Sequence, residues 1–380
     1  KEMIRSMVID VLQGQKQEVA SSQPFKQAPR GQVEPGVFDT VDEAIQAAKA
    51  AQARFEDCTL ATREKVIADI RAAMRPRVQE LAQKTVEETG MGRVADKVLK
   101  LNLTLDKTPG VEDLVTECET GDNGMTLYEL SAYGVIGAIT PSTNPAETLI
   151  CNTIGMLAAG NAVFFSVHPG AKHLSRLLVS ELNQIIAKSI GIENLIVTLR
   201  EPSIESAQEM MLHPDVSLLV VTGGPGVVKQ ALQSGKKVIG AGAGNPPAFV
   251  DETADIKKAA QDIVLGASLD NNILCIAEKS VVAMRQIEPQ LVQEMVKAGC
   301  VLIDNQQDIQ RLVDLTVLPN GTPNKKFVGK NASVILDAAH IPYNGDPRLI
   351  IMRTPKDHPF AVIEMLMPIL PVVTVDSFDE

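Results

Sequence analysis

The 380-residue sequence contains no tryptophan, and only 3% of its residues are aromatic. Its hydrophobic fraction is nevertheless 45%, so a sizeable core can be built, mainly from aliphatic side chains and methionine. No apolar run approaches the roughly 20 residues that a membrane-spanning helix needs, and no secretory signal is visible. Length and composition therefore predict a globular protein of about two or three domains without a membrane partner.

Basic charge and paired cysteines are also scarce. The formal net charge of -11 argues against a nucleic-acid partner, because phosphate backbones are bound by basic surfaces. The cysteines are odd in number, scattered and without a CxxC pair: Cys58, Cys118, Cys151, Cys275 and Cys300. This pattern predicts free thiols in a reducing compartment, not a disulfide framework. The histidines are isolated as well, so we expect no metal site.

The first 36 residues combine an apolar stripe with a polar stretch. The apolar residues recur at helical spacing over residues 1–13: Met3, Ile4, Met7, Val8, Val11 and Leu12. The following residues are rich in Gln, Ser, Pro and Gly, so we expect an amphipathic segment over residues 1–20 and a flexible linker over residues 21–36. The helix could dock on its own domain, on a neighbouring subunit or, as a docking peptide, on another protein.

The rest of the chain has an α/β texture. Residues 41–88 have an Ala-rich helical pattern that ends at Gly90 and Gly92, and a polar segment over residues 108–126 is expected to wrap the surface. Apolar runs and helical patterns then alternate: strands are predicted over residues 135–140, 161–167, 194–199, 216–223 and 237–243, and helices over residues 145–159, 170–188, 203–212 and 225–234. This alternation predicts a parallel sheet covered by helices on both faces.

Four of these strands end in small, polar or turn-forming residues. The ends comprise Thr140, Pro141, Ser142, Thr143 and Asn144; His168, Pro169 and Gly170; Thr222, Gly223 and Gly224, with Val227 in the next helix; and Ala241 and Gly242. Parallel sheets bind ligands at the carboxyl ends of their strands. We therefore expect these residues to form one rim and one site.

Three of the strand ends suggest specific chemistry, each with a plainer alternative. Gly223 and Gly224 would let the backbone approach a pyrophosphate at a helix N-terminus, although the segment is neither a GxGxxG nor a Walker A motif and could be a tight turn. Asn144 could donate to an oxyanion or cap the following helix. His168, before a Pro-Gly pair, could bind a phosphate or ribose, or serve as a turn residue.

Two further residues are candidates in the second half. Cys275 follows an Asn-Asn pair; a thiol attacks only when deprotonated, so it needs a helix terminus, a dipole or a base nearby. The alternative is an ordinary buried cysteine. Glu364 could hydrogen-bond a ribose or be a solvated carboxylate at a helix end. No GxSxG elbow is present, so a serine hydrolase is not indicated.

Taken together, the motifs resemble the aldehyde dehydrogenase superfamily, and within it the coenzyme A-acylating branch of bacterial microcompartments. They are ETGMGR (88–93), TPGVEDL (108–114), TPSTNPAET (140–148), HPGAK (168–172), VTGGPGVV (221–228), GAGAGNPP (240–247), DETAD (251–255), DNNILCIAEKS (270–280) and EMLMPILPVV (364–373). Their order matches the family from about Val37 to the last residue. TPGVEDL and CIAEKS favour the propanal enzymes over the acetaldehyde enzymes.

The resemblance implies a domain organisation. We expect an NAD-binding, Rossmann-type domain with N-terminal helices over residues 37–240 and an α/β catalytic domain over residues 241–380. Family members continue beyond the position of Glu380, so this catalytic domain is expected to be incomplete at its C-terminus. The resemblance also implies a homodimer or homotetramer.

The resemblance also implies residue roles. Cys275 is at the position of the nucleophile, and Asn144, with Thr143 beside it, is at the position of the oxyanion donor. The Thr222–Gly224 turn matches the segment near the dinucleotide phosphates, and His168 replaces a lysine that touches the adenosine ribose. Glu364 matches the glutamate on the nicotinamide ribose. The remaining cofactor-binding residues implied are Thr140, Pro141, Ser142, Pro169, Gly170, Val227, Ala241, Gly242 and Leu366.

One substitution decides the expected chemistry. Hydrolytic relatives carry a glutamate that activates water, whereas residues 240–244 of this chain are Gly-Ala-Gly-Ala-Gly. Without that base the acyl-cysteine should hydrolyse slowly, and coenzyme A can accept the acyl group after NAD has taken the hydride. The rival interpretations are a hydrolytic aldehyde dehydrogenase and a non-catalytic cargo or scaffold protein.

The resemblance also bears on the N-terminal helix. Microcompartment members carry a short amphipathic helix on a linker that targets them to the shell interior. Residues 1–13 are therefore interpreted as an encapsulation peptide that contacts shell or core proteins. The implied location is the cytoplasm, inside a bacterial microcompartment.

Overall fold

The computed structural model describes residues 34–379, which form two compact units. Unit 1 comprises residues 34–89 and Lys97–Gly242, and unit 2 comprises Gly90–Asp96 and residues 243–379. The predicted amphipathic segment over residues 1–20 lies outside the described residues, as does the predicted linker up to residue 33. No helix in the described range is both long and apolar enough to cross a membrane.

Unit 1 contains a six-stranded, fully parallel sheet in the order β1-β6-β5-β4-β7-β8. Its strands are β1 (Val37–Phe38), β4 (Val135–Ile139), β5 (Ala162–Ser166), β6 (Ile196–Leu199), β7 (Val216–Thr222) and β8 (Lys237–Ala241). The five predicted strands are confirmed. The edge strand β1 was not predicted, because two residues that pair only with Thr198 and Leu199 leave no periodic pattern.

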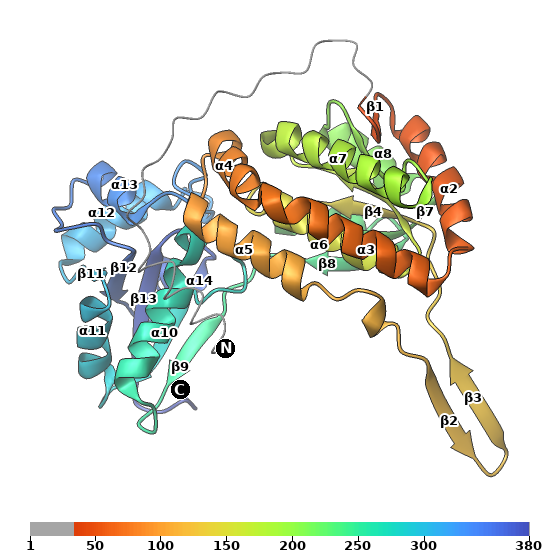
Figure 1. The fold of residues 1–380 in the computed structure, drawn as a ribbon. Helices are drawn as coiled ribbons and strands as arrows, with labels where there is room; N and C mark the ends of the chain where they lie inside the picture. The colour runs from red at the N-terminus through yellow and green to blue at the C-terminus, as the bar shows by residue number, and fades with distance from the viewer. Residues whose placement is uncertain (1–33, 380) are drawn as a thin grey trace. The chain divides into compact units, whose positions relative to one another are not determined.

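Helices cover both faces of this sheet, as predicted (Figure 1). The helices between its strands are α6 (Pro145–Ala158), α7 (Lys172–Ile190), α8 (Ile204–Leu212) and α9 (Pro225–Leu232), and the N-terminal helices are α2 (Val41–Glu56), α3 (Leu60–Met74), α4 (Val78–Thr89) and α5 (Val94–Lys107). The chain runs from β4 through β5 to β6, and then returns to β7 on the other side of β4. The connections from β4 to β5 and from β5 to β6 run in one direction along the sheet, and the connection from β6 to β7 runs in the other. Because such crossovers are right-handed, α6 and α7 lie on one face and α8 lies on the other. Helix α2 packs beside α8.

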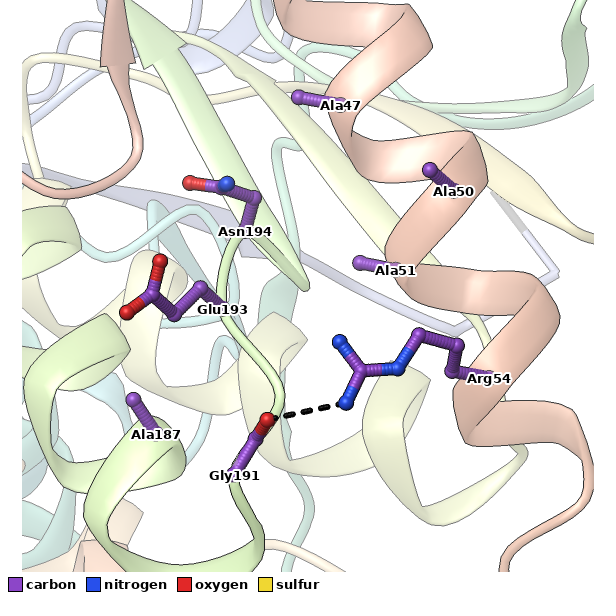
Figure 2. A pocket seen from close by; sticks show the side chains of 8 residues that line it. All are labelled: Ala47, Ala50, Ala51, Arg54, Ala187, Gly191, Glu193 and Asn194. Atoms are coloured by element: carbon purple, nitrogen blue, oxygen red, sulfur yellow. Dashed lines mark hydrogen bonds between the residues drawn. The ribbon is translucent and has the colours of Figure 1, made fainter.

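A cavity of about 340 Å³ lies in unit 1 between the end of α2 and the segment that enters β6 (Figure 2). Its lining residues are Ala47, Ala50, Ala51, Arg54, Ala187, Gly191, Glu193 and Asn194. Arg54 donates a hydrogen bond of 3.1 Å to the carbonyl oxygen of Gly191. The lining segment precedes β6, so the cavity lies toward the amino ends of the strands, and none of the predicted site residues lines it.

The polar segment predicted to wrap the surface forms a β-hairpin instead. Its strands β2 (Glu117–Gly121) and β3 (Gly124–Tyr128) pair only with each other in antiparallel register. All ten strand residues are exposed, and in Figure 1 the hairpin points away from the sheet and helices of unit 1. The prediction of a wrapping segment was wrong, because the two strands satisfy each other's backbone hydrogen bonds and need no surface beneath them.

Unit 2 contains a second parallel sheet in the order β11-β12-β13-β10-β9. Its strands are β9 (Pro247–Val250), β10 (Ser280–Met284), β11 (Cys300–Leu302), β12 (Leu349–Arg353) and β13 (Ile369–Val375). Its helices are α10 (Ile256–Ser268), α11 (Glu288–Lys297), α12 (Gln306–Thr316), α13 (Ala332–Ala338) and α14 (Pro359–Val362).

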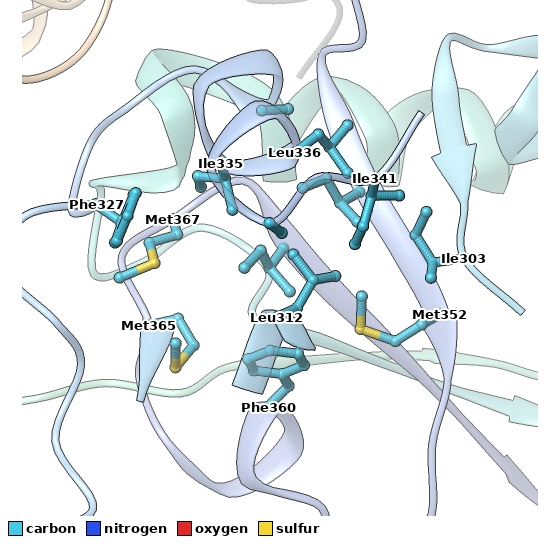
Figure 3. Close-up of a cluster of buried hydrophobic side chains, with 14 of the residues drawn as sticks. Ile303, Leu312, Phe327, Ile335, Leu336, Ile341, Met352, Phe360, Met365 and Met367 are labelled. Carbon is cyan, nitrogen blue, oxygen red and sulfur yellow. The ribbon is translucent and has the colours of Figure 1, made fainter. Parts of the chain in front are cut away.

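Two hydrophobic clusters pack on the two faces of this sheet. Successive residues of β12 alternate between them: Ile350 and Met352 belong to one cluster, and Leu349 and Ile351 belong to the other. Figure 3 shows the first cluster, in which side chains of β12, α12 and α13 gather. Ile273, only 1% exposed, also belongs to it, so the segment just before Cys275 is anchored in the core of unit 2.

The structural division after Gly242 lies close to the predicted domain boundary after residue 240, but Gly90–Asp96 differs from that expectation. This segment belongs to unit 2 because its contacts are there. The Gly92 N–H donates to the carbonyl of Gly329 at 2.8 Å, and the Asp96 carboxylate pairs with Arg348 at 3.1 Å. Sequence periodicity cannot reveal such partners, since they lie more than 200 residues away along the chain.

Candidate active site

The strand ends singled out in unit 1 lie along one edge of its sheet. Strands β5, β4, β7 and β8 are neighbours and parallel, so the residues that follow them emerge on the same side. The strand order reverses between β4 and β7, which makes this point the topological switch where open α/β sheets bind ligands. Residues 140–144 follow β4 on one side of the switch, and Thr222, Gly223 and Gly224 end β7 on the other.

Asn144 lies at the N-cap position of α6, but its side chain makes no capping hydrogen bond. Its Oδ1 accepts a hydrogen bond of 2.5 Å from the Lys100 ammonium group, and its Nδ2 donates to Thr143 Oγ1 at 3.2 Å. Because an ammonium group can only donate, the contact with Lys100 fixes the orientation of the amide. The side chain therefore presents an N–H donor, as an oxyanion site requires.

The glycine turn after β7 leads directly into α9. Gly224 is the N-cap residue of this helix and makes no side-chain cap. A Cβ added to Gly224 would meet no atom within 4 Å, whereas one added to Gly223 would lie 2.7 Å from Val227 Cγ1. An open glycine turn at a helix N-terminus offers backbone N–H groups to an anion. The turn therefore fits a pyrophosphate.

His168 and the residues after it form a tight turn. The His168 Nδ1 atom accepts a hydrogen bond of 3.0 Å from the Gly170 N–H at the start of a 3₁₀ turn, Pro169–Ala171. The side chain thus serves as a turn residue, the plainer of its two alternatives, while the ring is exposed beside the carboxyl end of β5. Contact of this ring with an adenosine ribose stays a prediction.

In unit 2, the chain before Cys275 has an unusual backbone. Asp270, Asn271 and Asn272 have φ values of 50°, 55° and 62°. The left-handed region disfavours residues with a Cβ by roughly 1–2 kcal/mol each, and asparagine and aspartate tolerate it best. The Asp-Asn-Asn sequence therefore matches this backbone. We call residues 270–275 the nucleophile turn.

Buried and partly buried hydrogen bonds hold the nucleophile turn in this conformation. Asp270 Oδ1 accepts from the Arg93 N–H at 2.8 Å, and Asn271 Oδ1 accepts from Arg93 Nε at 2.9 Å. Asn272 Nδ2 donates to the carbonyls of Ala267 at 2.7 Å and Glu278 at 3.0 Å. Backbone strain persists only where the surroundings over-determine it, and these side-chain contacts supply that constraint.

The Cys275 thiol is exposed at the end of this turn, so it is not the ordinary buried cysteine that was the alternative. Cys300 shows the contrast, because burial raises the pKa of its thiol to about 12. The segment after β8 passes close to Cys275: a Cβ added to Gly244 would lie 2.9 Å from the Cys275 carbonyl oxygen. Glycine at this position lets the two segments approach.

Glu364 is half-buried, not a solvated carboxylate at a helix end. Burial raises the pKa of its carboxyl group, opposed by a hydrogen bond from the Gly244 N–H and by the charge of Lys279. Its Oε1 atom is buried without a hydrogen-bond partner among the described residues. Native structures rarely leave a buried acceptor unsatisfied, so this oxygen fits a ligand hydroxyl such as that of a ribose. Leu366, two residues on, has a φ of 52° and accepts a hydrogen bond from the Gly329 N–H.

Comparison with known proteins places these features in a family. The model of the aldehyde dehydrogenase family matches residues 11–380. The chain belongs to the aldehyde dehydrogenase family. This family member is 50% identical over 345 residues to a CoA-propanoylating propanal dehydrogenase of Salmonella typhimurium, covering 90% of this chain and 74% of the relative.

Solved structures of acylating enzymes have the same fold. The propionaldehyde dehydrogenase of Rhodopseudomonas palustris, solved with coenzyme A and an acylated cysteine, is 48% identical with a TM-score of 0.88, covering 91% of this chain and 80% of that one. The propionaldehyde dehydrogenase from a fucose-utilisation microcompartment of Clostridium phytofermentans has the same identity and TM-score, covering 91% and 79%. An engineered glycolyl-CoA reductase with bound NADP+ is 48% identical with a TM-score of 0.87, covering 90% and 78%. The expected α/β fold and the resemblance to acylating aldehyde dehydrogenases are confirmed.

Sequence reasoning missed two buried lysines in this aldehyde dehydrogenase. Lys97 is 0% exposed and donates to the Thr143 carbonyl at 3.3 Å, while Lys100 is 6% exposed and also pairs with Glu147 at 3.2 Å. The sequence could have indicated this burial, since Lys97 lies on the same helical face as the apolar residue Leu105, which is also buried. A lysine on an apolar stripe is rarely buried without a polar partner.

Proposed function

We propose that this chain oxidises a short-chain aldehyde to its acyl-CoA with NAD as the hydride acceptor, through a thioester on Cys275. Propanal is favoured over acetaldehyde. The observation that carries the proposal is the exposed Cys275 thiol at the end of a turn held by buried and partly buried hydrogen bonds. The similarity to a CoA-propanoylating enzyme and to a structure with coenzyme A and an acylated cysteine supports the same reaction.

Covalent chemistry begins at Cys275. Its thiolate attacks the aldehyde carbon, and the carbonyl oxygen becomes an oxyanion. Asn144 supplies the N–H donor that stabilises this charge, because Lys100 holds its amide oxygen on the opposite side. The bound nicotinamide ring would supply the hydride acceptor that turns the thiohemiacetal into a thioester. The coenzyme A thiolate then attacks the acyl carbon, and the Cys275 sulfur leaves as a thiolate.

Glu364 and the residues at the strand ends are the proposed cofactor-binding residues. Glu364 Oε1, a buried oxygen without a partner among the described residues, would accept from a hydroxyl of the nicotinamide ribose, and the Thr222–Gly224 turn would hold the phosphates. His168 would contact the adenosine ribose. The remaining proposed cofactor-binding residues are Thr140, Pro141, Ser142, Thr143, Pro169, Gly170, Val227, Ala241, Gly242 and Leu366.

Transfer to coenzyme A is favoured over hydrolysis because this chain has no carboxylate residue in the segment where hydrolytic relatives carry the glutamate that activates water. Residues 240–244 contain only glycine and alanine. A positioned general base contributes roughly 100-fold or more, so hydrolysis of the thioester should be slower by that order. A hydrolytic aldehyde dehydrogenase is therefore the weaker alternative. A non-catalytic scaffold would have no use for the constrained turn before Cys275.

The test is NADH formation from propanal with and without coenzyme A. We expect steady turnover only when coenzyme A is present, and after its omission a burst of at most one NADH for each Cys275. Steady turnover without coenzyme A would support hydrolysis and contradict the proposal. The Cys275→Ala variant should lose activity and keep NAD binding; an active variant would disprove the assignment of the nucleophile.

We further propose that the enzyme is a homodimer or homotetramer that works in the cytoplasm, inside a bacterial microcompartment. The similarity to an enzyme from a fucose-utilisation microcompartment supports this setting. The residues proposed to contact shell or core proteins are 1–13. Deletion of residues 1–20 should leave kinetics nearly unchanged and abolish co-purification with shells, whereas loss of activity would favour a helix docked on the enzyme itself.

A further inference from the structure

A lysine of unit 2 is buried beside the nucleophile turn. Lys279 is only 4% exposed and immediately precedes β10. Its backbone N–H donates to the Pro246 carbonyl at 2.9 Å, which holds the residue against the segment that leads into β9. The side chain is thus attached to the sheet framework and not to a mobile loop.

The ammonium group of Lys279 uses its donors on the nucleophile turn. It donates to the backbone carbonyl of Asn272 at 3.0 Å, to the side-chain Oδ1 of the same residue, and to the backbone carbonyl of Leu274 at 2.6 Å. An ammonium group has three N–H donors, so these contacts account for all of them. Two of the acceptors are backbone carbonyls within three residues of Cys275.

Burial of this cation is unfavourable by itself. Desolvation lowers the pKa of Lys279 to about 8, and the charges of Glu364, Cys275 and Glu278 oppose that shift. The charged and titratable groups facing the ammonium therefore come from the turn itself, from the residue before Lys279, and from the segment between α14 and β13. The cation is accommodated because oxygens of the nucleophile turn accept its N–H groups.

We propose that Lys279 is a positioning residue for the nucleophile: its ammonium group fixes the carbonyls of Asn272 and Leu274 and so holds the turn that presents the Cys275 thiol. The assignment rests on the proposed function, in which Cys275 is the nucleophile. Fixing the two carbonyls holds the left-handed turn, and with it the position from which the Cys275 sulfur attacks the aldehyde. Lys279 touches neither substrate nor cofactor in this role.

The test compares Lys279→Met with Lys236→Met as a matched control. Lys236 Nζ also donates to two backbone carbonyls, of His213 at 2.8 Å and Val216 at 2.7 Å, but it belongs to unit 1. Alkylation of Cys275 by iodoacetamide at pH 7 is followed by peptide mass spectrometry, with the exposed thiol of Cys118 as the internal reference. The propanal-dependent burst of NADH and the KM for propanal are measured on the same proteins.

For Lys279→Met we expect alkylation of Cys275 and the burst rate each to fall by about tenfold or more, because the turn loses the contacts that fix its carbonyls and a small displacement of a reacting group lowers its rate by this order. Alkylation of Cys118 and the KM should hardly change, and Lys236→Met should match the wild type. A merely structural role would lower the melting temperature without this selective loss. If a folded Lys279→Met protein reacts at Cys275 within about twofold of the wild-type rate, the proposal is wrong.

A variant that fails to fold does not end the test. Lys279→Gln keeps N–H donors on a shorter side chain that cannot make all three contacts; slower alkylation of Cys275 in this variant supports the proposal, while a wild-type rate overturns it. Alkylation needs neither aldehyde nor coenzyme A. If wild-type protein forms no NADH in a CoA-dependent reaction, the proposed function fails, and the alkylation result still decides the role of Lys279.

Discussion

Gly244→Ala should displace the nucleophile while leaving the fold intact. The added Cβ would lie 2.9 Å from the Cys275 carbonyl oxygen, about 0.5 Å inside the range of ordinary contacts that begins at 3.4 Å. The obstructing atom belongs to the backbone, so it cannot rotate away as a side chain would. Gly244 does not have a positive φ, so the strain comes from this contact alone.

A displacement of that size predicts the magnitude of the loss. Misplacing a reacting group by 1 Å lowers the rate by about 100-fold, so a shift of about 0.5 Å should lower the acylation rate by roughly tenfold. Overpacking should lower the free energy of unfolding by about 1 kcal/mol. Stopped-flow measurement of the propanal-dependent burst and urea unfolding give the two quantities.

The matched control is Gly155→Ala, because a Cβ there would meet no atom within 4 Å. This residue lies inside α6, where alanine should raise stability by about 0.5–1 kcal/mol and leave the burst unchanged. The reasoning would be refuted by a Gly244→Ala enzyme with the wild-type burst rate and the wild-type unfolding midpoint.

Three further outcomes are expected. Glu364→Gln should weaken NAD binding by about tenfold through loss of one charge-assisted hydrogen bond, with unchanged alkylation of Cys275; unaltered binding in a fluorescence titration would argue against a ribose contact. Lys100→Met should slow acylation by about tenfold or more, because the Asn144 amide loses its fixed orientation, and a normal burst would contradict that role. The pKa of Lys279 is lowered to about 8 in the folded protein, so the unfolded chain binds this proton more tightly than the folded protein does. The free energy of unfolding of the wild type, relative to that of Lys279→Met, should therefore rise by about 2 kcal/mol between pH 7.5 and pH 9.5. Urea unfolding at the two pH values checks this, and a constant difference would be incompatible with a cation that loses its charge in this range.

Much of unit 1 could be predicted because its strands are near-continuous apolar runs with turn residues after them. The burial of every residue in β4, β5 and β6 explains why the pattern was strong. The hairpin β2–β3 could not be recognised, since all its residues are exposed and polar and apolar residues mix without a period. A strand that faces no core leaves little trace in the sequence.

The site was predictable in parts. The candidate residues at the ends of β4, β5, β7 and β8 followed from local patterns, and parallel pairing brings those ends to one edge. The side-chain contacts that give Asn144 its orientation did not follow, because Lys100 comes from a helix that precedes it by 44 residues. Local propensity carries no information on which distant polar groups meet.

The sequence by itself determined where β4, β5, β6, β7 and β8 lie, that Cys275 follows an Asp-Asn-Asn segment suited to left-handed backbone, and that residues 240–244 have no carboxylate. Only the tertiary structure decided that this segment is left-handed, that Arg93 and Lys279 hold it, and that the thiol is exposed. The reason is physical. A strained turn is stable only when its surroundings constrain it. Arg93 is 178 residues away from Asn271 along the chain and contacts it only in the folded protein. No local stretch of sequence therefore encodes the contacts that hold the turn before Cys275.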